Sequence, residues 1–361
     1  MRTDILKEME ISTQLLNSEE VVFPRVVDLH PVNGRCNLNC AWCIGKKGYK
    51  KNDPLVDHFS IRGVDTIIEN VLNPKYQKYW PLEFHICGCD SEPLLKSKET
   101  SYLIEVLKSK KRTVELITNG LLINIENAKS LMLLDKLSIS LDVITDEDYF
   151  LYKTNNTRGE KKGVTKTIEN IEMISRLRNK EVRNVSIYVT FVTTPRTFDP
   201  DKWREMFIKL KSIGVNHIQV RSDLNESFGS VIGLESKIKE IAEELNVTEL
   251  DYDSNDNFDI KYHSPDQSEA SFEKCVAPYF WPAIGMDLKM YRCAHTTISV
   301  YQSFLDLKNT GFYEFYIKTK NKLCKEIDCI GCQKKCPPII NRFNYNCSQG
   351  EEHYENKRIR D

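Results

Sequence analysis

The chain has 361 residues, of which 40% are hydrophobic and 29% charged, enough for one large and one smaller folded domain. The charges of its 51 Lys and Arg residues and 52 Asp and Glu residues nearly cancel, so the chain has no overall electrostatic field that would attract nucleic acid or anionic lipid. No apolar run approaches the roughly 18 residues that span a bilayer, and the first residues lack the apolar segment of a secretory signal. We therefore expect a cytoplasmic protein with no membrane or nucleic-acid partner.

Short runs of alternating apolar and polar residues recur along the first two thirds of the chain, separated by helical stretches. This order is typical of an α/β fold built on a parallel sheet, here a partial (β/α)6 TIM-type barrel. An antiparallel sheet with one solvated face is the alternative, which the long helical connections disfavour. The expected strands are 25–30, 82–89, 113–118, 136–143, 185–194 and 217–223, and the expected helices include 4–16, 101–110, 163–177, 201–213 and 234–245.

Four of the expected strands, 82–89, 136–143, 185–194 and 217–223, have one apolar and one polar face. A barrel with a packed interior would carry bulky branched residues inside. Here the apolar face must meet the covering helices, so the polar face is predicted to line a wet, ligand-holding cavity. The polar-face residues are Glu83, His85, Cys87, Ser138, Ser140, Asp142, Ser186, Tyr188, Thr190, His217, Gln219, Arg221 and Asp223.

The strand–helix rhythm stops near residue 245. We divide the chain into an N-terminal helical segment (1–24), the barrel (25–245), a polar, aspartate-rich linker (246–270) and a small cysteine-rich domain (271–361). The chain holds 12 cysteines, most of them in two dense groups. In a reducing compartment such grouped thiols hold metal more often than they form disulfides. Scattered buried thiols that act as small hydrophobes are the alternative.

The first group is Cys36, Cys40 and Cys43, directly after the first expected strand. Spacings of four and three residues let three thiolates converge within one loop. Three thiolates on a four-iron cluster leave one iron open for substrate or cofactor. A structural zinc site prefers four closing ligands, and a zinc knuckle would have to borrow its fourth from a distant residue.

This CxxxCxxC loop, with the aromatic residue Trp42 before its last cysteine, resembles that of the radical S-adenosylmethionine (SAM) enzymes. The resemblance implies that Cys36, Cys40 and Cys43 hold a [4Fe–4S] cluster whose fourth iron binds the amino and carboxylate groups of SAM. It further implies that Trp42 contacts the adenine region. An electron delivered to the cluster would then cleave SAM to methionine and a 5′-deoxyadenosyl radical.

Further segments across residues 25–225 resemble the same family. Residues 90–95 are similar to the family's Gly-Gly-Glu-Pro segment, with Asp90 and Ser91 in place of the glycines and Glu92 set to receive the methionine ammonium. The resemblance also covers residues 118–120 and the strand at 138–142. We therefore expect the SAM-binding residues to be Trp42, Asp90, Ser91, Glu92, Asn119, Ser140 and Asp142.

Seven cysteines after residue 270 form the second group. They resemble the SPASM extension of radical SAM enzymes, which carries two auxiliary four-iron clusters, although Leu288 stands where the family has glycine and the middle cysteine spacing differs. A zinc ribbon is the alternative. Residues 279–292 are expected to form a hairpin. In chain order, the resemblance assigns Cys275, Cys293 and Cys336 to one cluster and Cys324, Cys329, Cys332 and Cys347 to the other.

Two further cysteines, Cys87 and Cys89, end the second expected strand. Either could donate a hydrogen atom to a substrate radical and so complete an epimerisation; a buried structural thiol is the alternative. Nearby polar-face residues could orient a polar substrate or could serve as structural hydrogen-bonding groups. These are Glu83, His85, Tyr188 and Arg221.

SPASM relatives often modify ribosomally made peptides by epimerisation, cross-linking or oxidation, which makes a peptide the first expected substrate and a flavodoxin- or ferredoxin-type protein the electron donor. Only 35 residues precede Cys36, too few for a leader-binding module, so we expect a short peptide without leader docking. A small metabolite such as a sugar or aminocyclitol is the second reading. A non-enzymatic iron–sulfur carrier or zinc-binding module is the third hypothesis. The basic loop 46–51 is interpreted as a solvated loop rather than as an RNA contact.

Overall fold

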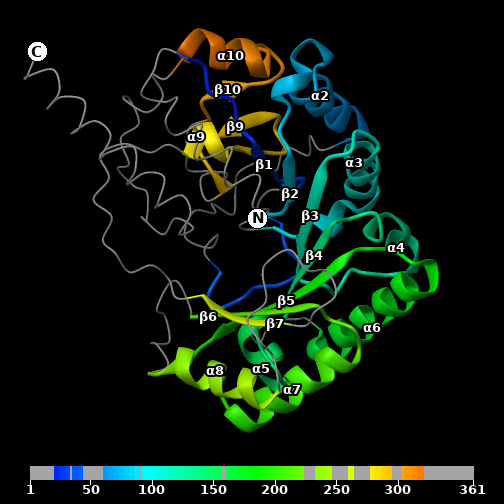
Figure 1. The fold of residues 1–361 in the computed structure, drawn as a ribbon, viewed down its shortest axis with the longest axis vertical. Helices are drawn as coiled ribbons and strands as arrows, with labels where there is room; N and C mark the ends of the chain where they lie inside the picture. The colour runs from blue at the N-terminus through cyan, green and yellow to red at the C-terminus, as the bar shows by residue number, and fades with distance from the viewer. Residues whose placement is uncertain are drawn as a thin grey trace, which may run out of the picture.

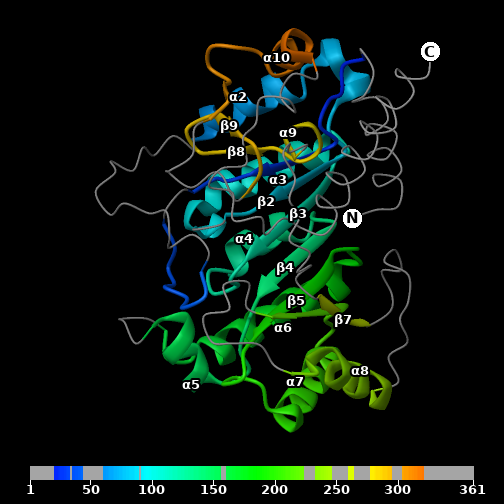
Figure 2. The ribbon, with the colours of Figure 1, turned by 90° about the vertical axis from the view of Figure 1, so that its left-hand side faces the viewer.

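The computed structural model describes residues 20–32, 35–43, 60–88, 91–155, 160–222, 232–245, 259–263, 277–294 and 303–320. Within them a curved sheet runs through the molecule (Figures 1 and 2). Its first seven strands lie side by side in chain order, and every neighbouring pair is parallel. They are β1 (Val26–Leu29), β2 (Glu83–Ile86), β3 (Thr113–Thr118), β4 (Lys136–Ser140), β5 (Ser186–Thr193), β6 (His217–Ser222) and β7 (Asp259–His263).

Helices connect these strands and cover the outer side of the sheet (Figure 1). Several begin where a polar side chain satisfies the first free backbone N–H groups: Ser60 caps α2, Asn124 forms a capping box with Asn127 at α4, and Asp199 precedes Pro200 at α7. None of the described helices is long and apolar enough to cross a bilayer. The longer helices are α2 (Ile61–Val71), α3 (Ser97–Ser109), α4 (Ile125–Leu131), α6 (Gly163–Glu181), α7 (Pro200–Ser212) and α8 (Leu234–Glu244).

Short helical segments complete the connections. η2 (Pro74–Tyr79) precedes β2, η3 (Pro93–Lys96) follows β2, and α5 (Asp146–Asp148) and η4 (Tyr149–Lys153) follow β4.

The parallel order confirms the α/β barrel-type fold, with all six expected strands present within their expected ranges, and rules out the antiparallel alternative. The expected helices at 101–110, 163–177, 201–213 and 234–245 are also present. The linker interpretation missed one element, because β7 lies inside residues 246–270 and pairs in parallel with β6. Its sequence follows an aspartate-rich stretch that hides the strand. The expected helix at 4–16 lies outside the described residues.

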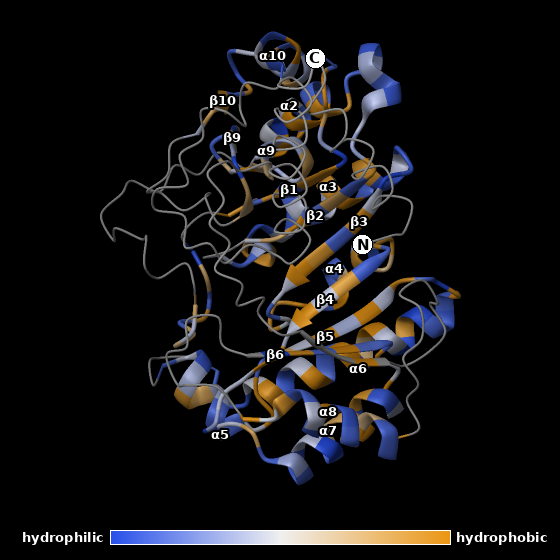
Figure 3. Cartoon of the chain, turned by 60° about the vertical axis from the view of Figure 1, so that its left-hand side comes forward, coloured by the Kyte–Doolittle hydropathy of each residue, from blue (hydrophilic) through white to orange (hydrophobic). Residues whose placement is uncertain are grey.

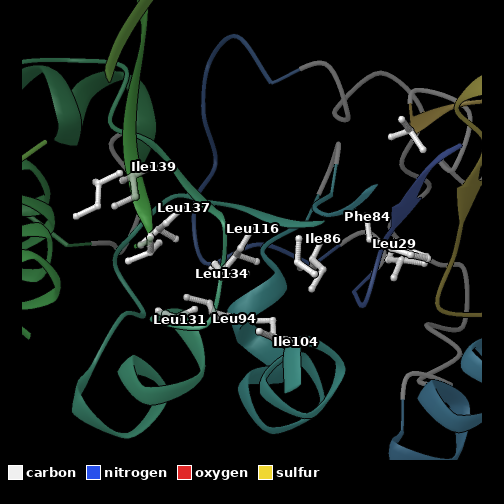
Figure 4. Packing of buried hydrophobic residues seen from close by; sticks show 14 of the residues in the cluster. Leu29, Phe84, Ile86, Leu94, Ile104, Leu116, Leu131, Leu134, Leu137 and Ile139 are labelled. Carbon is white, nitrogen blue, oxygen red and sulfur yellow. The ribbon is translucent and has the colours of Figure 1, made fainter. Parts of the chain in front are cut away.

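The apolar faces of the strands pack against the helices, as the alternation predicts. Figure 4 shows Leu116, Ile86 and Phe84 lining the side of the sheet that α3 and α4 cover. Each of the three side chains is completely buried, which contributes about 1.5–3 kcal/mol per residue in transfer free energy. Figure 3 shows the same division along the strands and on the outer helices, whose exposed surfaces are largely hydrophilic.

The opposite face of the strands is polar, also as expected. Its charged residues pair with one another: Glu83, His85 and Glu115 are each at most 7% exposed and lie within ion-pair distance. This part of the inner face is therefore a packed polar network rather than the open wet surface that alternation alone predicts. The reason is register, since His85 stands directly beside Asp28 and Glu115 in the sheet.

The C-terminal elements extend the sheet beyond β1 (Figure 1). Strand β8 (Ala283–Ile284) pairs in parallel with β1, and β9 (Lys289–Tyr291) pairs antiparallel with β8. A hairpin is thus present within the expected range 279–292, although residues 279 and 280 belong to the preceding helix α9 (Ala277–Phe280). Strand β10 (Leu305–Asp306) and α10 (Phe312–Thr319) follow, and Tyr313 of α10 donates to the carbonyl of Val71 in α2.

Candidate cofactor site

The loop at 35–43 carries the three N-terminal cysteines and is fastened to η4. Asn39 N–H donates to the carbonyl of Lys153 at 2.9 Å, and Ala41 N–H donates to that of Tyr152 at 2.7 Å. Cys43 N–H donates back to the carbonyl of Cys40 at 3.2 Å, which closes a tight turn. These bonds hold a loop without regular secondary structure against the end of the sheet.

The three thiols of this loop lie close enough to influence one another electrostatically. Burial raises the pKa of Cys40 to about 12, and negative charge on Cys36 or Cys43 would raise it further. Burial likewise raises the pKa of Cys36 to about 11. At neutral pH such thiols stay protonated unless a bound metal displaces their protons. Three neighbouring cysteines on one loop fit a [4Fe–4S] cluster with one open iron.

Trp42 lies inside this loop and is buried. Its ring stacks on Tyr152 of η4, with centroids 6.0 Å apart and planes inclined by 29°. The stack positions the loop by packing. Whether Trp42 also meets the adenine of SAM stays a prediction.

Glu92 joins the ends of β2 and β3. Its Oε1 accepts hydrogen bonds from the Thr118 hydroxyl at 2.6 Å and from Leu94 N–H at 3.1 Å, and its Oε2 accepts from Asn119 N–H at 2.8 Å. Glu92 is 2% exposed, and this burial raises its pKa. Two carboxylate oxygens offer about four acceptor sites, so a ligand ammonium could bond alongside these three donors.

Asn119 connects this carboxylate to the cysteine loop. Its Nδ2 donates to the side-chain oxygen of Asn37 at 2.7 Å and approaches the Cys36 sulfur at 3.8 Å. Glu92 N–H in turn donates to the carbonyl of Arg35 at 3.0 Å. The structure therefore brings together the first cysteine, Glu92 and Asn119, three expected site residues that lie far apart in the sequence.

Asp142 follows β4 and forms a buried ion pair. Its Oδ2 lies 2.9 Å from Lys153 Nζ, and both side chains are at most 7% exposed. Lys153 also donates to the carbonyls of Ser140 and Leu141. Burial alone would lower the pKa of Lys153, but Asp142 raises it above its usual value, so the lysine stays charged.

The backbone at Asp142 is unusual. Its φ is +64°, a left-handed conformation that few non-glycine residues adopt. Its second oxygen, Oδ1, is buried without a hydrogen-bond partner in the described part of the chain. Ser140 is half-buried and lies 3.4 Å from the Thr190 hydroxyl. An unpaired acceptor beside a hydroxyl suits a ligand that carries hydroxyl donors.

Ser91 folds back over the end of β2. Its hydroxyl donates to the carbonyl of Val32 at 2.5 Å. A Cβ at Gly88 would lie 2.0 Å from the Ser91 hydroxyl oxygen, so only glycine allows this approach. Asp90 and Cys89, between these two residues, lie outside the described residues.

Cys87 is buried at the end of β2. Its sulfur lies 3.4 Å from His30 Nε2, a thiol–imidazole contact between the ends of β1 and β2. Cys87 lies on the polar face of the sheet, as its place in the alternation predicts. Cys293, just after β9, is half-buried. The other C-terminal cysteines lie outside the described residues: Cys275, Cys324, Cys329, Cys332, Cys336 and Cys347.

Two other expected substrate contacts lie on β5 and β6. Tyr188 stacks on His217 with ring centroids 4.1 Å apart. Arg221 is half-buried, and its Nε has no hydrogen-bond partner within the described structure. Residue 223 lies outside that structure.

Sequence reasoning missed several residues of this region. Lys153 gave no signal, because it ends an aromatic stretch that reads as core. Asp28, His30 and Glu115 alternate with apolar neighbours in β1 and β3, so the period-2 pattern used for the other strands would have found them.

Comparisons with known proteins agree with this geometry. Residues 31–189 match the model of the Radical SAM superfamily. Streptococcus suis SuiB has a similar structure, with a TM-score of 0.57 at 12% identity over 86% of this chain and 70% of SuiB. AnSMEcpe with bound AdoMet has a TM-score of 0.53 at 17% identity over 93% of this chain and 98% of that protein. A search among curated proteins gives no match.

Members of this superfamily use a [4Fe–4S] cluster and SAM, and both similar structures have been solved with SAM bound. The described residues supply what these cofactors need: three thiols in one loop, a buried carboxylate joined to that loop through Asn119, and the unpaired acceptor of Asp142 after β4. Residues 31–189, which carry the three cysteines, Glu92, Asn119 and Asp142, therefore form a radical SAM domain.

Proposed function

We propose that this enzyme modifies a peptide by abstracting one of its hydrogen atoms. Cys36, Cys40 and Cys43 would hold a [4Fe–4S] cluster, which in its reduced state would supply the electron for the cleavage of SAM. The observation that carries the proposal is the junction of the cysteine loop with Glu92 through Asn119, which joins the cluster ligands to a carboxylate able to hold the methionine ammonium.

The chain's own residues bind and orient. Glu92 accepts the SAM ammonium while Thr118 and Asn119 fix its carboxylate. Asp142 and Ser140 accept or donate hydrogen bonds to ribose hydroxyls, with Lys153 holding Asp142 in place. Trp42, Asp90 and Ser91 complete the SAM site. Held by these residues, SAM would lie at the carboxyl ends of the strands, next to their polar face.

Polar-face residues orient the substrate in our proposal. The unpaired Nε of Arg221 would donate to a carboxylate or a carbonyl of the substrate. Tyr188 would contact the substrate through the face of its ring or through its hydroxyl. Streptococcus suis SuiB has been solved bound to the precursor peptide SuiA, so a protein of this fold accommodates a peptide. This supports a peptide as the substrate, ahead of the second candidate substrate, a sugar or aminocyclitol.

Epimerisation is the outcome that the described residues favour among epimerisation, cross-linking and oxidation. Cys87 is a buried thiol on the polar face and contacts His30 at 3.4 Å. A thiol there can return a hydrogen atom to a substrate radical from the side opposite to the abstraction. Cys89 is the second candidate donor.

The C-terminal cysteines would hold one or two auxiliary [4Fe–4S] clusters in a SPASM-type domain. Leu288 supports this assignment. It stands where the SPASM pattern has glycine, and its φ is +61°, a conformation that glycine adopts without strain. The backbone turn between β8 and β9 thus keeps the shape that a glycine would give it. We further propose a cytoplasmic enzyme with a flavodoxin- or ferredoxin-type electron donor.

An anaerobic assay tests the proposal. The reconstituted protein is incubated with SAM and dithionite, and 5′-deoxyadenosine is measured by chromatography. Wild type should release it, and Cys40→Ala should not. A protein that binds iron and sulfide but releases no 5′-deoxyadenosine would be an iron–sulfur carrier, and one that binds zinc at these cysteines would be a zinc module. Candidate peptides and aminocyclitols added in parallel identify the substrate class by substrate-dependent turnover.

A further inference from the structure

A buried group of charged side chains lies on the polar face of β1, β2 and β3, apart from the cysteine loop. We name Asp28, Glu83, His85 and Glu115 the His85 network. Their exposed fractions are between 4% and 7%. His85 Nε2 lies 2.7 Å from Glu83 Oε1 and 3.8 Å from Glu115 Oε2. We propose that Glu83, His85 and Glu115 bind one divalent first-row metal ion, independently of the iron–sulfur cluster.

The donor set and its spacing suit such an ion. One imidazole and two carboxylates bind zinc, manganese or iron(II), with metal–ligand distances of about 2.0–2.2 Å. Ligand atoms on one ion then lie about 3.0–3.5 Å apart. The observed separations of 2.7 and 3.8 Å bracket this range, so small side-chain rotations would bring all three atoms onto one centre.

An unpaired atom points to a missing ligand. Glu83 is 5% exposed, and its Oε2 is buried without a hydrogen-bond partner in the described structure. A buried carboxylate oxygen without a partner is destabilising, because no hydrogen bond offsets its loss of hydration. A metal bound by Glu83 would satisfy this oxygen directly or through a coordinated water.

The surrounding contacts are those that orient metal ligands. Asp28 Oδ1 lies 3.2 Å from His85 Nδ1, which leaves Nε2 to face the two glutamates. Trp281 Nε1 donates to the same Asp28 oxygen at 2.5 Å. This is the carboxylate–histidine–metal arrangement that fixes the ring and its tautomer.

The second carboxylate ligand is held as firmly. Glu115 Oε1 accepts from the Ser138 hydroxyl at 2.6 Å and from Lys136 Nζ at 3.0 Å. Its other oxygen, Oε2, is the one that faces His85.

Charge balance agrees with this arrangement. Without metal, both ring nitrogens of His85 face carboxylate oxygens, so the ring carries a proton on each. Three carboxylates then face two cations, His85 and Lys136, which leaves one buried negative charge among the described side chains. Metal binding releases the Nε2 proton to solvent and adds two positive charges, so the group becomes neutral.

Manganese(II) is the probe that separates this site from the cysteines, because thiolates prefer softer metals. The reconstituted holoprotein is titrated anaerobically with Mn²⁺, and free Mn²⁺ is measured from its six-line electron paramagnetic resonance signal. Wild type should bind one Mn²⁺ per chain. Glu83→Gln and Glu115→Gln should each weaken this binding at least tenfold. Glu105→Gln, a matched change at a glutamate that accepts from Ser130 at 2.9 Å, should bind as wild type does.

Trp281→Phe supplies a variant that keeps all three ligands. It removes the N–H that holds Asp28, together with part of the ring that packs edge-on against His85, and it should weaken Mn²⁺ binding about 10–100-fold, the usual effect of losing an outer-shell partner. Millimolar Mn²⁺ should raise the melting temperatures of wild type and Glu105→Gln by similar amounts. It should raise those of Glu83→Gln, Glu115→Gln and Trp281→Phe by less. Equal Mn²⁺ binding by wild type and Glu83→Gln would overturn the proposal and leave His85 as an imidazolium in a salt bridge. Release of 5′-deoxyadenosine is measured separately, so failure of either proposal is distinguishable.

Discussion

Lys153 and Asp142 form an ion pair, with Nζ 2.9 Å from Oδ2, that is almost completely buried and borders the cysteine loop. The same lysine binds the carbonyls of Ser140 and Leu141 through its side chain, and through its own carbonyl it anchors Asn39 in the loop. One residue thus links the end of β4 to the cluster ligands.

Replacing Lys153 by methionine should destabilise the protein strongly. The change leaves Asp142 as an unpaired buried charge, which costs about 3–5 kcal/mol of unfolding free energy. The matched control is Lys108→Met, whose pair with Asp135 is 24% and 43% exposed and should contribute less than about 1 kcal/mol. Urea denaturation of both variants measures the difference. Equal losses would contradict the role assigned to Lys153.

Glu92→Gln should lower both stability and SAM affinity. The amide replaces one acceptor oxygen by a donor, which then faces an N–H or O–H donor of Asn119, Thr118 or Leu94. The unsatisfied donors cost about 1–3 kcal/mol, and the ammonium of SAM loses its counter-charge. Denaturation and equilibrium dialysis with SAM measure the two effects. Unchanged SAM affinity in a folded variant would remove Glu92 from the site.

The His85 network should make stability fall as pH rises. Burial would lower the pKa of His85, but hydrogen bonds to Asp28 and Glu83 raise it to about 10, from 6.5 in an unfolded chain. A raised pKa stabilises fully below pH 6.5, and this stabilisation is lost as pH rises toward 10. The slope is at most about 1.4 kcal/mol per pH unit.

Urea denaturation between pH 6.5 and 8.5, without added divalent metal, tests this slope against His85→Gln. This window avoids the cysteines, whose raised pKa values of about 11 and 12 act at higher pH. Wild type should lose stability with pH more steeply than the variant. Parallel pH profiles would show that His85 is not protonated in the folded protein.

Cys87→Ala and Cys89→Ala test the hydrogen donor. If one thiol supplies the hydrogen atom, its variant should still release 5′-deoxyadenosine but yield no inverted product. In D2O the wild-type product should carry deuterium at the inverted carbon, because thiol hydrogens exchange with solvent. Mass spectrometry of the product decides, and inverted product from both variants would end this assignment.

The core between sheet and helices gives a matched pair of truncations. Leu116 in β3 is completely buried, whereas Ile125 at the start of α4 is 61% exposed. Leu116→Ala should cost about 2–5 kcal/mol, and Ile125→Ala should change stability by less than about 0.5 kcal/mol. Thermal unfolding distinguishes them; similar melting temperatures would contradict the packing in Figure 4.

The sequence alone predicted the six strands and the three cysteines of one loop, because both are local signals, and the helical stretches between the strands indicated a parallel sheet. Alternation over four to eight residues reports which face is buried, and Cys36, Cys40 and Cys43 lie in one loop. It could not find β7, whose five residues follow a polar stretch and are strand only because they pair with β6. The local sequence preference of these five residues carries no information about their pairing with β6.

Only the tertiary structure showed how distant polar residues meet. The sequence placed Glu83 and His85 on a polar face, yet strand register decided that Asp28 and Glu115 flank His85. Likewise Lys153 reads as part of an aromatic core segment until the fold sets it against Asp142. Charges are buried only where an opposite charge is in contact, and such contacts between residues far apart in the chain exist only after the strands have paired.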